Sequence, residues 1–119
     1  MTKPFALIVE DDPHLGSIFA ITLQEDFDTE IASDGSTGLI RLAQTVPDIV
    51  VLDLNLPDMD GKDILENIRK DSRFCNTRVI LCTADVRLAD TLQEKADIVL
   101  LKPVSPAQLR QMALRLTSN

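Results

Sequence analysis

Four short apolar runs divide the chain, and segments with helical periodicity separate them. The runs cover residues 5–9, 49–52, 79–82 and 98–101. Each run is too brief for a typical helix and is rich in β-branched residues, so each is predicted to be a strand buried on both faces. A weaker run over residues 29–32 mixes Glu30 with Ile31, a composition that suits a half-exposed edge strand.

The segments between the runs repeat apolar residues at the i, i+3, i+4, i+7 spacing of an amphipathic helix. Three such sets are Leu15, Ile18, Phe19 and Thr22; Leu39, Leu42, Ala43 and Val46; and Leu109, Met112, Ala113 and Leu116. Asp12, Asp60 and Ser105 stand where helices should begin, since their side chains can cap a first turn. Alternating strands and helices predict an α/β fold, a doubly wound five-stranded parallel sheet flanked by five helices.

Composition limits the class of protein. The 119 residues include 12 Lys and Arg against 19 Asp and Glu, a formal net charge of −7. A single soluble cytoplasmic domain over residues 1–119 is expected, with no membrane association and no direct nucleic-acid binding, because phosphate backbones are held by basic clusters. Cys75 and Cys82 have no metal or redox spacing and are expected to be reduced bystanders.

Polar residues follow the predicted strands, and the carboxyl ends of parallel strands meet at one edge of such a sheet. These residues are Glu10, Asp11 and Asp12 after the first strand, Asp53 and Asn55 after the third, Thr83 after the fourth and Lys102 after the fifth. Converging carboxylates repel each other unless a cation lies among them. Oxygen-only ligands in small number favour Mg²⁺, which keeps several of its waters.

A lysine and a hydroxyl beside a metal ion supply positive charge and a donor for a transferring phosphoryl group. The four glycines do not form the spacing of a nucleotide-binding loop. The nucleophile is therefore predicted to be a side chain, and Asp53 is able to form an aspartyl phosphate.

Four segments together resemble the receiver domains of two-component response regulators. They are LIVEDD at residues 7–12, DLNLPDMDG at residues 53–61, the pair Thr83 and Ala84, and the pair Lys102 and Pro103. The resemblance spans nearly the whole chain. It implies the flavodoxin-like receiver fold with strand order 2-1-3-4-5, and a cis peptide bond between Lys102 and Pro103.

The resemblance also implies roles for the residues at the strand ends. Asp53 would accept a phosphoryl group from a sensor histidine kinase or a histidine phosphotransfer protein. Glu10, Asp11, Asp53 and the backbone carbonyl of Asn55 would hold Mg²⁺, which leaves Asp12 as a helix cap.

Two further residues of the resemblance would contact the phosphoryl oxygens, namely Lys102 through its charge and Thr83 through an inward rotation of its hydroxyl. Asn55 and Asp85 occupy the positions where the family tunes the lifetime of the phosphoryl group. The remaining carboxylates of this region, Asp58, Asp60, Asp63 and Asp85, are expected to be caps or surface charges, and His14 a solvent-facing residue.

In the family, phosphorylation changes the surface of the fourth helix, fifth strand and fifth helix, here roughly residues 86–116. A downstream output domain or protein would dock there, and the chain would be a monomer or a phosphorylation-linked dimer. The chain departs from the family at Val99, where most members carry an aromatic residue that moves with the hydroxyl.

Two alternative functions stay open on the sequence alone. A haloacid-dehalogenase-like phosphatase also uses an aspartate nucleophile with Mg²⁺, but it needs a second aspartate where this chain has Asn55. A degenerate receiver would act as a scaffold without being phosphorylated, and Val99 is compatible with that reading. Under both the receiver hypothesis and the scaffold hypothesis, the chain is not an enzyme that acts on other substrates.

Overall fold

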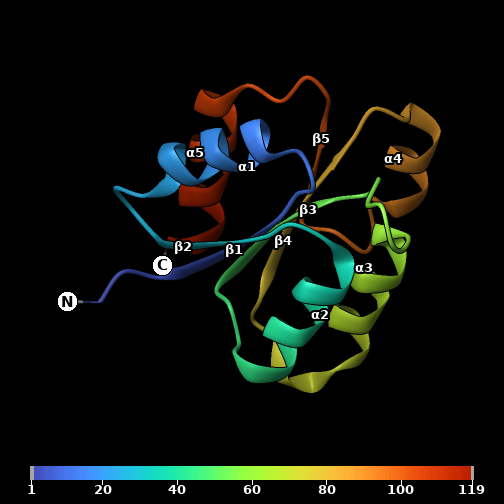
Figure 1. Cartoon of the computed structure of the whole chain (residues 1–119), viewed down its shortest axis with the longest axis horizontal. Coiled ribbons are helices and arrows are strands. Elements are labelled where there is room, and N and C mark those ends of the chain that lie inside the picture. Colours follow the sequence, from blue (N-terminus) through green and yellow to red (C-terminus); the bar gives the residue numbers. More distant parts are fainter. Residues whose placement is uncertain (1, 119) are drawn as a thin grey trace.

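The computed structural model describes residues 2–118, which form a parallel sheet between two layers of helices (Figure 1). The strands are β1 (Phe5–Val9), β2 (Asp28–Ala32), β3 (Ile49–Asp53), β4 (Arg78–Thr83) and β5 (Ile98–Leu101). The helices are α1 (Pro13–Leu23), α2 (Gly35–Gln44), α3 (Gly61–Lys70), α4 (Val86–Leu92) and α5 (Pro106–Thr117), with a short 3-10 turn, η1, at Ser72–Phe74. The strand order is β2-β1-β3-β4-β5, so the predicted doubly wound fold is confirmed.

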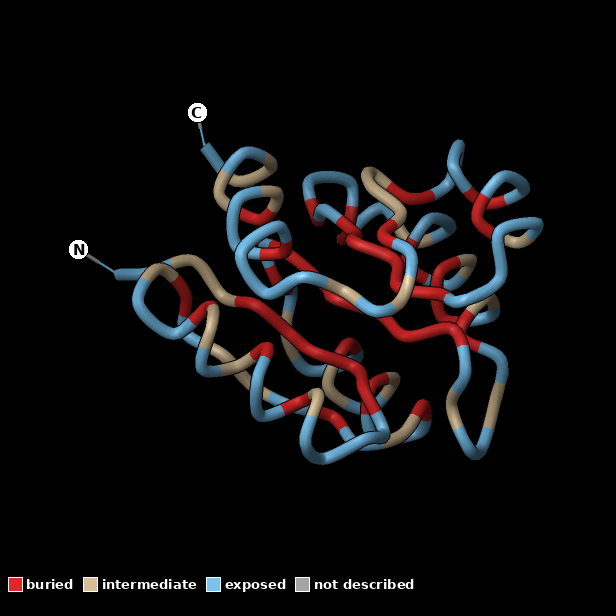
Figure 2. The backbone as a smooth tube through the Cα atoms, turned by 90° about the horizontal axis from the view of Figure 1, so that it is seen from above, coloured by how far each residue is buried: buried red, intermediate tan, exposed pale blue. Residues whose placement is uncertain are grey.

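Successive strand residues point to opposite faces of the sheet, and this alternation builds two separate apolar cores. Leu7, Val50 and Leu81 pack on one face with residues of α2, α3 and α4. Ile8 and Val51 belong to the other core, which α1 and α5 cover. The buried strands therefore run through the centre of the molecule while the outer turns of the helices are exposed (Figure 2).

Four of the five helices have an aspartate as the capping residue at their N-terminus. Asp12, Asp34, Asp60 and Asp85 cap α1 to α4, and each side chain accepts a backbone N–H of the first turn. Ser105 caps α5 through its bond from the Gln108 N–H. The caps predicted at Asp12, Asp60 and Ser105 are confirmed, and all five lie at the edge of the sheet where the strands end.

The predicted apolar stripes are right for α5 and partly wrong for α1 and α2. Ile18 is exposed, and the buried positions of α1 are Gly16, Phe19 and Leu23. Val46 lies beyond the end of α2 and is exposed, because Pro47 follows it and disfavours a helical residue before it. Ala43 lies within α2 on its exposed side.

The edge strand β2 was predicted to be half exposed, and its residues are mostly intermediate or exposed. Its Glu30 forms an ion pair with Arg41 of α2, which covers part of this strand. Within residues 2–118, no helix is both long enough and apolar enough to cross a membrane.

Candidate functional site

The parallel register brings the polar ends of four strands to one edge of the sheet. Asp53 is the last residue of β3, and it lies beside Cys82 of β4. Glu10 directly follows β1, Thr83 ends β4, and Lys102 directly follows β5. Glu10, Asp53 and Thr83 are the buried polar residues of this edge, with exposed fractions of 1–2%. The structure therefore brings these residues together at one edge of the sheet, as the sequence predicted.

Lys102 supplies the positive charge of this edge. Its Nζ lies 3.0 Å from Asp53 Oδ1 and 3.9 Å from Glu10 Oε1. Burial lowers the pKa of Lys102, but the hydrogen bond and charge of Asp53 and the charge of Glu10 outweigh it, so the net pKa is raised. Lys102 therefore stays protonated at neutral pH. The Lys102–Pro103 peptide bond is cis, as the resemblance implied.

Glu10 is a buried carboxylate whose two oxygens differ. Its Oε2 accepts the Asp12 N–H at 3.1 Å, whereas its Oε1 is buried and has no hydrogen-bond partner. Desolvation raises the pKa of Glu10 to about 7, with a further rise from the charge of Asp53. A buried oxygen without a partner is costly to a folded protein, so this atom indicates a missing ligand.

The carboxylate oxygens of Glu10, Asp11 and Asp53 fit a small cation. One oxygen from each residue lies within 4.8 Å of the others. Asp11 is exposed, whereas the other two are buried, so the cluster opens to solvent on one side. Hard oxygen donors with room for retained waters match the preference of Mg²⁺.

Thr83 lies at the site, and its hydroxyl oxygen is hydrogen-bonded to the backbone that follows β4. Its Oγ1 accepts the Asp85 N–H at 3.0 Å, in the turn that leads into α4. Asp85 in turn caps α4 by accepting the Arg87 and Leu88 N–H groups. A rotation of Thr83 toward a phosphoryl group would therefore break a bond at the start of α4.

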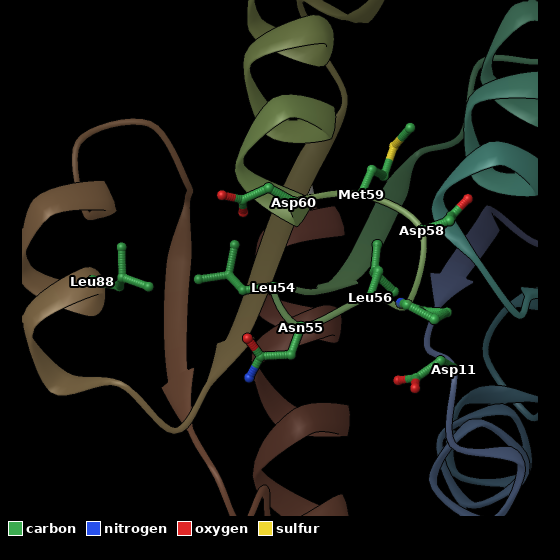
Figure 3. A pocket seen from close by; sticks show the side chains of 9 residues that line it. Asp11, Leu54, Asn55, Leu56, Asp58, Met59, Asp60 and Leu88 are labelled. Carbon is green, nitrogen blue, oxygen red and sulfur yellow. The ribbon is translucent and has the colours of Figure 1, made fainter.

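Asn55 is the second residue of the loop between β3 and α3, residues 54–60. Its N–H donates to Asp53 Oδ1 at 3.2 Å, and it pairs with Asp60 through an isolated bridge. The loop lines an open pocket of about 550 Å³ next to Asp11, and Leu54 and Leu88 face each other across it (Figure 3). The pocket is therefore bounded by this loop, by Asp11 of the carboxylate cluster and by Leu88 of α4.

Gly61 is the last residue of the DLNLPDMDG segment and the first residue of α3. A Cβ at Gly61 would lie 2.5 Å from the backbone oxygen of Asp53 and 2.7 Å from Leu54 Cα. The Gly61 N–H also donates to the Leu54 oxygen. The lack of a side chain therefore lets α3 begin directly against the backbone that carries Asp53.

Gly61→Ala should destabilise the fold by about 1–3 kcal/mol, because the methyl group meets backbone atoms that have no room to move. Urea unfolding measures this change. Gly16→Ala is the matched control, since its Cβ would meet only the side chain of Ile31, at 3.3 Å, and Ile31 is exposed on the edge strand β2. A loss of stability in Gly61→Ala no larger than in Gly16→Ala would contradict this packing argument.

Among the other carboxylates of this edge, Asp58 agrees with the expectation of a cap or surface charge, but the helix that it caps is a distant one. It is exposed, but it accepts hydrogen bonds from the Gly35 N–H, the Ser36 N–H and the Ser36 hydroxyl at the start of α2. Asp60 and Asp85 are caps and Asp63 is exposed, as expected. The sequence carries no signal for the Asp58 contact, because the partners lie more than twenty residues apart.

The other residues singled out in the sequence are Val99, His14 and the two cysteines. Val99 is half-buried and packs on the core beneath α4, with Leu88 on the same core. His14 is exposed on the first turn of α1. Both cysteines are free: Cys75 is exposed and Cys82 is buried. Desolvation, with the charge of Asp53, raises the pKa of Cys82 to about 12, so its thiol is not a nucleophile at neutral pH.

Comparisons with known proteins agree with this geometry. A family model for the response regulator receiver domain matches residues 6–114. The DNA-binding response regulator MtrA of Mycolicibacterium smegmatis is 37% identical over 107 residues, which are 87% of this chain and 46% of MtrA. The chain thus spans about half the length of the curated relatives it matches.

Solved structures give the same result for the fold. The receiver domain of the Francisella response regulator 1452 has a TM-score of 0.86 and 28% identity, with 97% of both chains covered. The chemotaxis response regulator CheY4 of Vibrio cholerae has a TM-score of 0.88 at 24% identity, covering 97% of this chain and 99% of that one. The second likeness concerns the fold alone.

Proposed function

This chain belongs to the response regulator receiver family of two-component signalling, and from that membership and the geometry we propose that Asp53 is its phosphoacceptor. The observation that carries the proposal is the position of Asp53. It is a buried carboxylate at a strand end, 3.0 Å from Lys102 Nζ and grouped with Glu10 and Asp11. A buried carboxylate beside a fixed cation and a candidate metal site has the surroundings of a nucleophile rather than of a surface charge.

The residues around Asp53 have separate tasks in this proposal. Glu10, Asp11, Asp53 and the backbone carbonyl of Asn55 would hold Mg²⁺, which supplies positive charge to the oxygens of the phosphoryl group when it is bound. Lys102 stays protonated and attracts the same oxygens. Thr83 would give up its contact with the Asp85 N–H and donate its hydroxyl to the phosphoryl group.

The partners follow from this chemistry. The donor would be a phosphohistidine on a sensor histidine kinase or on a histidine phosphotransfer protein. The acceptor of the signal would be an output domain or protein that docks on α4, β5 and α5. We propose that residues 1–119 act as a single cytoplasmic receiver domain with no membrane or nucleic-acid contact of its own, as a monomer or a phosphorylation-linked dimer. The DNA-binding activity in the name of MtrA is a property of that longer protein.

Receiver domains are signalling modules rather than enzymes that act on other substrates. The phosphatase alternative is disfavoured because Asn55, two residues after Asp53, cannot transfer a proton. The scaffold alternative is disfavoured because Glu10 Oε1 is buried without a hydrogen-bond partner, a cost that a metal ion would remove.

Intact mass after incubation with acetyl phosphate and Mg²⁺ tests the proposal. A receiver should gain one phosphoryl group and should not release phosphate steadily from small phosphate esters. Steady turnover without an adduct would indicate a phosphatase instead. Neither an adduct nor turnover would indicate the non-phosphorylated scaffold.

Magnesium binding should weaken by about tenfold between about pH 8 and about pH 6. The pKa of Glu10 is about 7 without metal, so a proton competes with Mg²⁺ for this carboxylate as the pH falls. The same raised pKa affects the stability of the metal-free fold. Protonated Glu10 stabilises the folded state, fully below its ordinary pKa near 4.5, and this contribution to the free energy of unfolding is lost as the pH rises through about 7.

Titration of Mg²⁺ followed by amide chemical shifts measures this pH dependence. Glu10→Gln carries no titrating group at this position, so its weaker binding should depend much less on pH. Equal Mg²⁺ affinity of the wild type at both ends of the range would contradict the proposed part of Glu10.

The switching surface is tested with beryllofluoride, an analogue of the phosphoryl group. With Mg²⁺ present, amide signals between residues 83 and 102 should shift, because Thr83 leaves the turn that begins α4. Val99 cannot report an aromatic rotamer change, so the shifts at β5 should be smaller than those at the start of α4. Signals that stay unmoved throughout this segment would favour the degenerate scaffold.

A further inference from the structure

We propose that Asp58 is a positioning residue that fixes the phosphoacceptor loop, residues 54–60, to the first turn of α2, so that Asn55 is held ready to bind Mg²⁺. The inference rests on the proposed function, because it assigns a task to a residue that does not itself touch the metal or the phosphoryl group. The juxtaposition that carries it joins two segments more than twenty residues apart.

The contacts of Asp58 are specific. Its Oδ1 accepts the Gly35 N–H at 2.8 Å, and its Oδ2 accepts the Ser36 N–H at 2.9 Å and the Ser36 hydroxyl at 2.7 Å. Asp34 accepts the next N–H of the helix, that of Thr37. Two carboxylates thus satisfy the first three N–H groups of α2, which have no partner inside the helix.

The electrostatics agree with a bound, ionised carboxylate. The Ser36 hydroxyl and the two backbone N–H groups lower the pKa of Asp58 to about 2. Asp58 is therefore charged throughout the neutral range, and it lies at the positive end of the α2 dipole. Figure 3 shows its side chain directed toward α2 and away from Asn55 and Asp11.

The neighbour of Asp58 forms a second contact between the same two segments. A Cβ at Gly35 would lie 2.2 Å from Met59 Cγ, so Met59 occupies the space that this glycine leaves free. Met59 is half-buried against the core beneath α2 and α3. The loop is thus held at its middle by Asp58 and Met59, and at its ends by the Asn55–Asp60 bridge and by Gly61.

The consequence concerns Asn55. It is exposed, and the contacts of its own backbone are the Asp60 bridge and the N–H bond to Asp53 Oδ1. The middle of the loop would move outward without the Asp58 contacts, and the backbone carbonyl of Asn55 would move with it. Groups that hold a metal ligand in place commonly change metal affinity by about tenfold or more when they are removed.

Asp58→Ala tests the inference, with Asp63→Ala as the matched control. Asp63 is an exposed carboxylate in the first turn of α3, so both changes remove one negative charge near the same edge. Asp58→Ala should raise the Mg²⁺ concentration for half-saturation by about tenfold, measured by amide shifts. The phosphorylation rate at saturating Mg²⁺ should return close to the wild-type rate, because the folded site itself is intact.

Three further measurements separate positioning from general stability. Hydrogen exchange of the Gly35 and Ser36 amides should accelerate in Asp58→Ala without metal, and it should stay unchanged in Asp63→Ala. Asp58→Asn keeps one acceptor oxygen and should recover part of the Mg²⁺ affinity. Ser36→Ala removes one of the three bonds and should have a smaller effect than Asp58→Ala.

The outcomes are distinguishable from those of the proposed function. A wild-type chain that neither binds Mg²⁺ nor takes up a phosphoryl group defeats the proposed function, and the inference with it. Normal wild-type behaviour with equal Mg²⁺ half-saturation in Asp58→Ala and Asp63→Ala overturns the inference alone. So does a defect that lowers only the maximal rate or the thermal stability.

Discussion

Asp53→Asn should abolish phosphorylation and leave the fold intact. Asparagine has nearly the same shape as aspartate, but its amide cannot form the acyl phosphate. The change also removes one of two neighbouring buried carboxylates, so the charge of Asp53, which adds to desolvation in raising the pKa of Glu10, is lost. The metal-free variant should therefore unfold at a urea concentration no lower than the wild type, while intact mass shows no adduct.

Asp60→Asn is the control for Asp53→Asn. Asp60 lies in the same loop and caps α3, and asparagine caps a helix about as well as aspartate. This variant should be phosphorylated like the wild type. An adduct on Asp53→Asn comparable to that on Asp60→Asn would show that another residue accepts the phosphoryl group.

Lys102→Met should lower the rate of phosphorylation by acetyl phosphate by about 10²–10³-fold. Lys102 Nζ lies 3.0 Å from Asp53 Oδ1 and is the positive charge that forms an ion pair with the proposed nucleophile. Methionine keeps the length of the side chain and removes this charge. The phosphorylation rate is measured by quenching the reaction at successive times and determining the intact mass.

Mg²⁺ affinity is a second measurement on Lys102→Met, and unlike the phosphorylation rate it should not fall. The ammonium group and Mg²⁺ compete for the same carboxylates, so Mg²⁺ affinity should be unchanged or higher in the variant. Lys62→Met removes a positive charge from the first turn of α3, whereas the ion pairs of Glu10 and Asp53 are with Lys102, so it should leave the rate near that of the wild type. A rate for Lys102→Met within a few-fold of Lys62→Met would contradict the assigned part of Lys102.

The fold and the meeting of the site residues could be predicted from the sequence because both follow from strand ends. Apolar runs with β-branched residues locate buried strands, and parallel strands necessarily end at one edge. Asp53, Thr83 and Lys102 therefore reach the same edge whatever the loops between them do. The strand order came from the resemblance, since alternation alone does not fix it.

Features that depend on the packing of distant segments could not be predicted. The exposure of Ile18 depends on which side of α1 faces the sheet. A helix with few apolar residues does not show from its sequence which side is buried. The bond from the Asp85 N–H to Thr83, and the contact of Asp58 with α2, depend on loop conformations that sequence periodicity does not describe. The raised pKa of Glu10 follows from its burial, which only the structure supplies.

Localisation of the phosphoryl group tests the central claim most directly. Borohydride reduces an aspartyl phosphate to homoserine, a stable mark that fragmentation of the tryptic peptide spanning residues 42–62 assigns to one position. After treatment with acetyl phosphate and Mg²⁺, homoserine should be found at Asp53 and at no other aspartate of that peptide. Homoserine at Asp48, Asp58 or Asp60 instead, or none at Asp53 in a chain that carries the adduct, would contradict it.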